Sequence, residues 1–130
     1  DMADILRQMD EADGLVLGSP VNFGDVTALT RRFQERLICY AYWPWDSPAP
    51  TYRKAKTTPK PTVILWSCAA PQMLGRLAFS TGKILKTTAR AIGGEVVGTV
   101  VTGLVPRDPK PALPERTRQK ARALAQKLAA

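Results

Sequence analysis

The chain has 130 residues, a length that fits one domain, and 45% of them are hydrophobic, which is enough to build a core. Its two cysteines, Cys39 and Cys68, fit neither a metal-ligand spacing nor a disulfide framework. The complete lack of histidine excludes Ser-His-Asp and Cys-His catalysis and histidine-ligated zinc. If this protein is an enzyme, we expect a cofactor to carry its chemistry.

The charge is uneven along the chain, which has a formal net charge of +8. Acids are concentrated in the first 25 residues, whereas the stretch from Ser47 to Gly94 contains bases and no acid. Such a surface attracts nucleic acid, anionic membranes or phosphorylated ligands, or is simply a solvated face. No apolar run reaches the ~18 residues of a membrane span and no leader pattern is present, so we expect a cytoplasmic protein without a membrane partner.

Helix and strand patterns alternate over the first forty residues. Apolar side chains at helical spacing predict a helix over Asp1–Ala12. Residues 14–18 form a short apolar run typical of a buried parallel strand, which Ser19-Pro20 is expected to end. Asp25 is predicted to cap a second helix, whose apolar stripe consists of Val26, Leu29, Phe33 and Leu37.

Residues 39–61 show no period and are predicted to form a long loop rich in aromatic residues and proline. Structureless loops of this length are usually functional. The aromatic cluster Tyr40–Trp45 within it has two interpretations, a subunit interface or a small satellite core. Trp and Tyr are enriched at interfaces, which favours the first and predicts a homo-oligomer.

The second half of the chain repeats the alternation. We predict a buried strand over Thr62–Trp66, a helix from about Gln72 to Ile92, a third strand over Glu95–Gly103 and, after a proline-rich connection, a closing helix from Pro114. The order predicts an α/β fold with a parallel sheet and helices on both faces. Because ligands bind beyond the carboxyl ends of such strands, the segments to examine are 19–25, 67–72 and 103–109.

Residues 11–28 carry the most specific motif: Ala-Asp-Gly, an apolar strand, Ser-Pro, a polar-aromatic pair, Gly and a helix. This pattern strongly resembles the third strand and flavin loop of the NAD(P)H-dependent FMN reductase family, which has a flavodoxin-like fold. Ser67–Pro71 and the following Leu74-Gly75-Arg76 look like that family's second flavin-contacting loop and next helix. The resemblance implies an oxidoreductase of the flavin or quinone reductase type. It would bind FMN, take a hydride from NADH or NADPH through the flavin N5 and reduce a small-molecule acceptor.

The resemblance implies no catalytic side chain and no metal, but a set of flavin contacts in two loops: Ser19, Pro20, Val21, Asn22, Phe23, Gly24, Ser67, Cys68, Ala69 and Ala70. Backbone groups of a tight turn match the alternating donors and acceptors of the flavin edge, and Gly24 permits close approach. Many relatives have an aromatic residue where this chain has Asn22, so ring stacking is not implied there. Cys68 has no neighbouring histidine or second cysteine and is expected to be a small core or pocket residue.

Members of that family begin with a strand, a phosphate-binding loop, a helix and a second strand, whereas this chain begins at the helix before the third strand. We therefore expect a single domain over residues 1–130 that is an N-terminally incomplete copy, lacking the first two strands and the phosphate loop. Strands three to five of the order 2-1-3-4-5 would leave Leu15–Gly18 as an open apolar edge, suited to pairing with another chain.

Two alternatives to reductase activity stay open on the sequence. One is a flavin-binding electron-transfer module without turnover, and the other is a non-enzymatic remnant whose basic face binds partners. Bases on the last helix are expected to be solvated, and no nucleic-acid motif accompanies them, so nucleic-acid binding is not expected. Among the remaining bases, Arg53, Lys54 and Arg76 are candidates for attracting the phosphates of a nicotinamide nucleotide.

Overall fold

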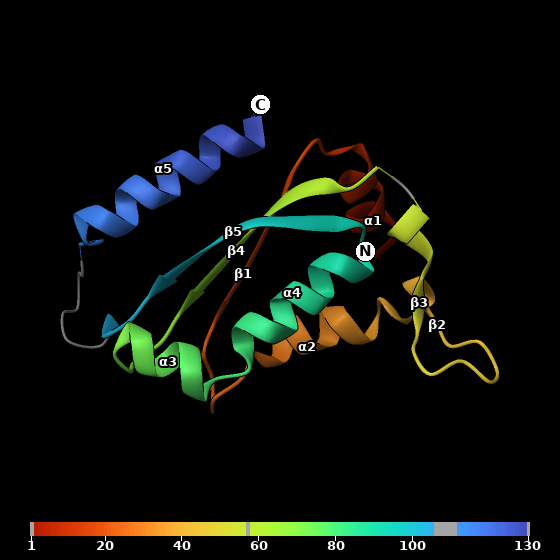
Figure 1. Ribbon diagram of the computed structural model, residues 1–130, viewed down its shortest axis with the longest axis horizontal. Coiled ribbons are helices and arrows are strands. Elements are labelled where there is room, and N and C mark those ends of the chain that lie inside the picture. Colours follow the sequence, from red (N-terminus) through yellow and green to blue (C-terminus); the bar gives the residue numbers. More distant parts are fainter. Residues whose placement is uncertain (1, 57, 106–111, 130) are drawn as a thin grey trace.

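The computed structural model describes residues 2–56, 58–105 and 112–129 (Figure 1). Its elements in chain order are α1 (Met2–Glu11), β1 (Leu15–Pro20), α2 (Ala28–Glu35), η1 (Ile38–Tyr40), β2 (Ala41–Tyr42), β3 (Thr51–Tyr52), η2 (Arg53–Lys56), β4 (Lys60–Ser67), α3 (Gln72–Ala78), α4 (Thr81–Ala91), β5 (Gly94–Thr102) and α5 (Glu115–Ala129). Among the described helices, none is long and apolar enough to cross a membrane.

The main sheet has three parallel strands in the order β1-β4-β5. Leu15 lies opposite Thr62 at the start of the β1–β4 pair, and Pro20 lies opposite Ser67 at its end. Because all three strands run the same way, their carboxyl ends lie at one end of the sheet (Figure 1). The predicted alternation of helices with parallel strands is therefore confirmed.

Helices cover both faces of this sheet (Figure 1). On one face, Leu124 of α5 packs against Val63 and Val100, and Ala121 and Leu128 of the same helix join this cluster. On the other face, Ile64 and Trp66 pack with buried side chains of α4, while α1 and α2 complete the layer. The period-2 alternation of β4, with Val63 on one face and Ile64 on the other, is what divides the core into two layers.

One part of the sheet has little cover in the described chain. There β1 pairs only with β4, and Val16 is 54% exposed although it is a strand valine. Leu65 on β4, which lies opposite Gly18, is 37% exposed. The predicted open apolar edge is thus present over the described residues.

The predicted loop over residues 39–61 is wrong in part. Its middle is an antiparallel hairpin, in which Ala41 pairs with Tyr52 and Tyr42 with Thr51, and 3-10 turns flank it on both sides. Strand β4 also starts earlier than predicted, at Lys60. A two-residue ladder is too short to produce a periodic pattern, so the sequence could not reveal it.

The predicted helix over residues 72–92 is interrupted. Phe79 adopts an extended conformation, with φ −105° and ψ 140°, and separates α3 from α4. Two smaller differences affect the first loop. Ser19 and Pro20 belong to β1 rather than ending it, and the cap of α2 is Thr27 rather than Asp25. Pro20 is compatible with the strand because β1 is at the edge of the sheet, where a missing N–H breaks no ladder bond.

Candidate functional site

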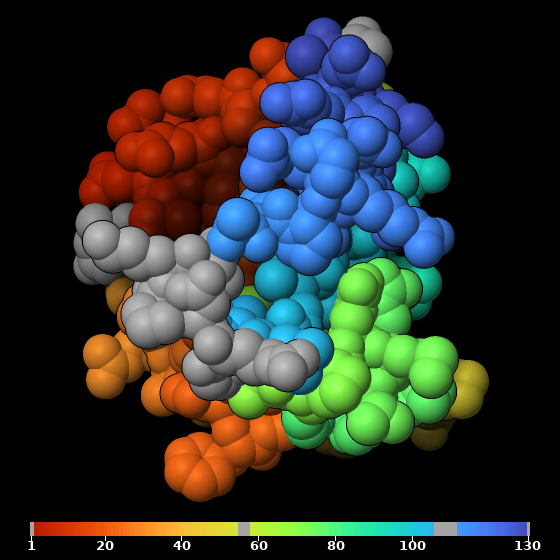
Figure 2. Space-filling view, turned by 90° about the vertical axis from the view of Figure 1, so that its left-hand side faces the viewer, coloured from red at the N-terminus to blue at the C-terminus, as the bar shows by residue number. Residues whose placement is uncertain are grey.

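The two predicted loops meet at the carboxyl ends of β1 and β4. The backbone N–H of Val21 donates to the carbonyl of Ser67 at 2.8 Å, which extends the strand pairing into the loops. Figure 2 looks onto this end of the sheet, where the orange segment after β1 and the green helix α3 lie side by side at the lower edge, below the blue helix α5. The structure therefore brings the ten sequence-predicted residues into one rim.

The segment Asn22–Asp25 is a tight turn held by two reciprocal backbone hydrogen bonds. Asn22 N–H donates to the Asp25 carbonyl at 2.8 Å, and Asp25 N–H donates to the Asn22 carbonyl at 2.9 Å. Both central residues have positive φ, 48° at Phe23 and 82° at Gly24, as in a type I′ turn. Glycine suits this conformation, but a bulky aromatic residue does not.

Phe23 is the unusual member of this turn. Its side chain is fully exposed, with a relative exposure of 108%, so no packing within the described chain compensates for its left-handed backbone. Residues kept in sparsely populated conformations concentrate at ligand sites. The sequence motif identified Phe23 as a ring-contact candidate, but only the backbone shows that it is strained.

Side chains below the turn hold it in place. The buried hydroxyl of Ser19 donates to the Pro20 carbonyl at 2.9 Å and accepts from Thr27 N–H at 3.1 Å, which ties the turn to the start of α2. From the other side, the N–H and hydroxyl of Ser80 donate to the Gly24 carbonyl at 3.2 Å and 3.3 Å. Ser19 is thus committed to supporting the loop from beneath.

Asp25 closes the turn electrostatically. Its carboxylate accepts from the Arg31 guanidinium and from Val26 N–H, the latter at 2.6 Å. The hydrogen bond from Arg31 is the main reason that the pKa of Asp25 is lowered below its ordinary value. A carboxylate that is ionised and already paired acts as a brace for the loop rather than as a proton donor.

The loop after β5 joins the second predicted loop. Cys68 N–H donates to the Thr102 carbonyl at 2.9 Å, and Leu104 N–H donates to the Ala70 carbonyl at 3.1 Å. Gly103 is required at this junction, because a Cβ there would lie 2.5 Å from the Gln72 nitrogen. Thr102, Gly103 and Leu104 therefore border the same rim, at the start of the third segment that the sequence singled out, and residues 106–109 of that segment lie outside the described residues.

Cys68 is a core residue at the base of this rim. It is 4% exposed, and its thiol donates to the Ala70 carbonyl at 3.3 Å. Burial raises the pKa of the Cys68 thiol, which disfavours the reactive thiolate. The neighbouring Gly75 leaves room for the sulfur, since a Cβ there would lie 2.7 Å from it. The prediction of a small packed residue is confirmed.

The upper surface of the rim offers backbone donors and apolar side chains. Within the described chain, the amides of Phe23, Gly24, Ala69 and Ala70 donate to no protein acceptor. Large apolar side chains from these loops and from α3 are exposed around them, namely Phe23, Met73, Leu74, Leu77 and Leu104. The sequence places Met73 and Leu77 in the predicted helix over residues 72–92, but in the structure both side chains are exposed on α3, which ends at Phe79.

A cationic cavity borders this end of the sheet. About 460 Å³ in volume, it lies between α3, β5 and α5 and is lined by Arg76, Arg116 and Lys120 among others. None of these three cations forms an ion pair with a described residue. Of the bases that the sequence proposed as phosphate-attracting, only Arg76 is near the rim. Lys54 lies at the opposite end of the sheet, where its ammonium pairs with Asp10 at 2.7 Å.

The aromatic cluster is remote from the rim. Trp43 and Trp45 lie between β2 and β3, on the hairpin at the far right of Figure 1. They are 63% and 96% exposed, and the Trp43 indole N–H donates to the Ser47 carbonyl at 2.8 Å. These residues therefore do not contribute to the rim of the same chain. Among the described residues, no cluster of side chains suited to a metal ion occurs.

No protein-family model matches the chain. A stretch of 36 residues, 28% of this chain, is 50% identical to an iron-sulfur flavoprotein of Methanocaldococcus jannaschii, and the match spans 19% of that protein.

Two solved structures share the fold. The crystal structure of general stress protein 14 of Treponema denticola, in complex with FMN, superposes with a TM-score of 0.57 at 17% identity, over 99% of this chain and 72% of that chain. A thermophilic tryptophan halogenase structure from Streptomycin violaceusniger gives 0.56 at 15% identity, over 97% and 72%. At these identities the likeness shows the fold, and the chain has the flavodoxin-like α/β architecture that its sequence predicts.

Proposed function

We propose that this chain binds FMN at the rim formed by residues 19–24 and 67–70 and acts as an NAD(P)H-dependent oxidoreductase. The observation that carries the proposal is the set of unpartnered amides at Phe23, Gly24, Ala69 and Ala70. They stand in two loops joined by the Val21–Ser67 hydrogen bond, at the carboxyl ends of parallel strands, where ligands of such sheets bind.

The residues present fit a flavin. An isoalloxazine ring has a polar edge that needs hydrogen-bond donors and acceptors, and flat faces that need apolar contact. Uncharged amides of the turn suit the edge, while the exposed Phe23 and Met73 side chains supply apolar surface. In this proposal Val21, Asn22, Phe23 and Gly24 hold the ring edge from one loop.

The second loop contributes in a different way. In this proposal Ser67, Ala69 and Ala70 offer backbone groups and small side chains to the ligand. Cys68 packs beneath them and supports the loop through its hydrogen bond to the Ala70 carbonyl. Ser19 and Pro20 likewise shape the first loop from beneath. When bound, the flavin supplies the redox chemistry, by hydride exchange with a nicotinamide nucleotide at its N5.

The comparisons support the flavin-binding part of this proposal, whereas the electron donor is proposed from the cations near the rim. One similar protein is by name a flavoprotein, and one structural neighbour was solved in complex with FMN. For the electron donor, the cavity lined by Arg76, Arg116 and Lys120 offers cations next to the rim. We propose that these cations attract the phosphates of NADH or NADPH, since guanidinium groups bind phosphate with paired hydrogen bonds.

We also propose that the protein works as a homo-oligomer. The exposed Trp43 and Trp45 side chains lie on a projecting hairpin, and Val16 is exposed on an edge strand. Exposed aromatic clusters and open strand edges are both surfaces that a second chain covers. The nicotinamide donor and the small-molecule acceptor are parts of the proposal that the turnover assay below addresses, and a cytoplasmic location is a further part of it.

The test is a titration of the chain with FMN and with riboflavin, followed by flavin absorbance near ~450 nm, where the oxidised cofactor that carries the chemistry absorbs. Both ligands share the ring that the rim is proposed to hold, so both should bind with similar affinity. Replacing Gly24 by Val forces a β-branched residue into φ 82° and should weaken both. Gly18→Ala is the matched control, because a Cβ there meets nothing nearer than 3.6 Å.

Two results would contradict the proposal. Folded parent protein that binds neither flavin has no flavin site, and a folded Gly24→Val variant with unchanged affinity has its site elsewhere. If flavin binds, NADH and NADPH oxidation with a quinone acceptor distinguishes a reductase from an electron-transfer module. Absence of turnover with bound flavin would favour the module.

A further inference from the structure

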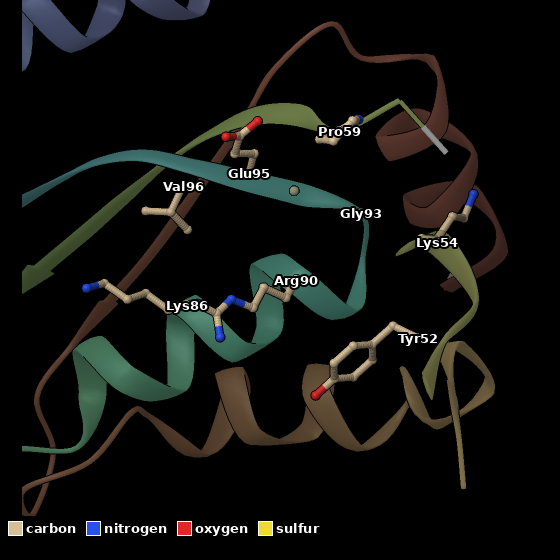
Figure 3. Close-up of a pocket in the computed structure, with 9 residues that line it drawn as sticks. Tyr52, Lys54, Pro59, Lys86, Arg90, Gly93, Glu95 and Val96 are labelled. Atoms are coloured by element: carbon tan, nitrogen blue, oxygen red, sulfur yellow. The ribbon is translucent and has the colours of Figure 1, made fainter. Parts of the chain in front are cut away.

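A second cavity lies at the opposite end of the sheet from the flavin rim. Its volume is about 690 Å³, within the range of sites for small molecules. It is bordered by the second half of α4, by the first residues of β5, and by Tyr52, Lys54 and Pro59 (Figure 3). The proposed flavin function does not use any residue of this cavity.

Two cations on α4, Lys86 and Arg90, line this cavity. Lys86 and Arg90 are one helical turn apart, so their charges repel each other. Neither side chain forms an ion pair with any residue that the structure describes. Arg90 lies in the last turn of α4, where the helix dipole favours a cation, but Lys86 is one turn too early for that explanation.

The other charged residues around the cavity do not neutralise this pair. Glu95 precedes Val96 on β5, and Val96 packs toward α4, so the period of the strand directs the Glu95 carboxylate to the other face of the sheet. Figure 3 shows Glu95 and Val96 on opposite sides of β5. Lys54 is already paired with Asp10 at 2.7 Å.

The remaining wall is suited to an apolar group. Tyr52, Pro59 and Val96 line the cavity from three different segments, and Gly93 and Gly94 add backbone without side chains. A site with an apolar wall and two unpaired cations on one side matches a ligand that has an apolar body and an anionic end.

We propose that this cavity binds a phosphorylated small molecule, with the phosphate between Lys86 and Arg90 and the organic part against Tyr52, Pro59 and Val96. The Arg90 guanidinium can give two parallel hydrogen bonds to a phosphate, and the Lys86 ammonium adds a compact charge. A bound phosphate also removes the repulsion between the two cations. None of the residues that line this cavity belongs to the flavin rim, so a ligand bound here does not compete with the flavin ring.

The experiment compares three probes on the full chain: 5′-AMP, adenosine, which lacks the phosphate, and inorganic phosphate, which lacks the organic part. Affinities are measured by calorimetry, and the site is located by NMR shifts of backbone amides. AMP should bind more tightly than either fragment and should shift Glu95 and Val96 but not Asn22–Asp25. Arg90→Gln should lower AMP affinity by about tenfold or more, the effect of losing a charge-assisted hydrogen bond, and Lys86→Gln should lower it as well.

The matched control is Lys83→Gln, because Lys83 lies on the same helix but lines a different groove, beside α2. It removes the same charge and should leave AMP affinity unchanged. An equal loss in all three variants would overturn the proposal in favour of diffuse attraction by a basic chain. Equal affinity for adenosine and AMP would show that the phosphate is not bound by the two cations. Equal affinity for inorganic phosphate and AMP would show that the organic part is not bound by the apolar wall. The three side chains are solvent-exposed, so we expect all three variants to fold, and circular dichroism of each variant checks this.

Discussion

Replacing Phe23 by asparagine should stabilise the protein and weaken flavin binding at the same time. Phe23 has φ 48° and precedes Gly24 with φ 82° in the turn that the proposed flavin edge contacts. Asparagine followed by glycine is the favoured pair for a type I′ turn, because both residues tolerate positive φ. The substitution therefore makes the turn more compatible with its own backbone while removing the aromatic ring.

The magnitude follows from exposure and conformation. Because Phe23 is 108% exposed, its removal loses no buried contact in the free chain. A non-glycine residue in the left-handed region costs about 1–2 kcal/mol, and asparagine incurs only part of this. We expect a gain of about 1 kcal/mol in unfolding free energy, which for a domain of this size raises Tm by roughly 3–5 °C. If the ring packs on the flavin, its loss costs about 0.5–1.5 kcal/mol, or roughly 2–12-fold in Kd.

Thermal unfolding by circular dichroism measures the first effect, and FMN titration measures the second. The control is Asp46→Asn, at another exposed residue with positive φ, 62°, where the native side chain already suits the conformation. It should change neither Tm nor Kd. A lower Tm in Phe23→Asn would show that the ring stabilises the free turn, and an unchanged Kd would show that the ring does not touch the flavin.

Three further outcomes follow from the structure. Because the pKa of Asp25 is lowered from its ordinary 3.8, its ionised carboxylate stabilises the fold above pH 3.8, and this stabilisation is lost as the pH falls toward the folded-state pKa. Lowering the pH to about 3 should therefore reduce Tm more in the parent than in Asp25→Asn, and parallel pH profiles of the two proteins would refute this. Combined Trp43→Ala and Trp45→Ala should shift sedimentation toward smaller species; an identical mass before and after would exclude the hairpin as the interface. Gly103→Ala places a Cβ 2.5 Å from a backbone nitrogen and should cost about 1–3 kcal/mol in urea unfolding, whereas Gly18→Ala should not; equal stability of both variants would contradict the close packing.

Local sequence signals were sufficient for the architecture. The continuous apolar runs before Ser19 and before Ser67 predicted buried parallel strands, and the structure pairs them in that way. Loops that follow such strands lie together at one end of the sheet, so the two-loop rim could be placed from the motif alone. The closing helix was likewise predicted from the sequence, and Leu124, Ala121 and Leu128 lie three and four residues apart on its packed face, as the helical period requires.

What the tertiary structure decided depends on contacts between residues distant in sequence. The break at Phe79 separates α3 from α4 within the predicted helix, and next to it Ser80 N–H donates to the Gly24 carbonyl of a loop distant in sequence. The left-handed backbone of Phe23 arises from the reciprocal bonds of its turn, which no propensity for phenylalanine indicates. The cavity beside Lys86 and Arg90 exists only because α4, β5 and the segment after β3 converge there, and the strand period directs the nearby acid, Glu95, to the other face.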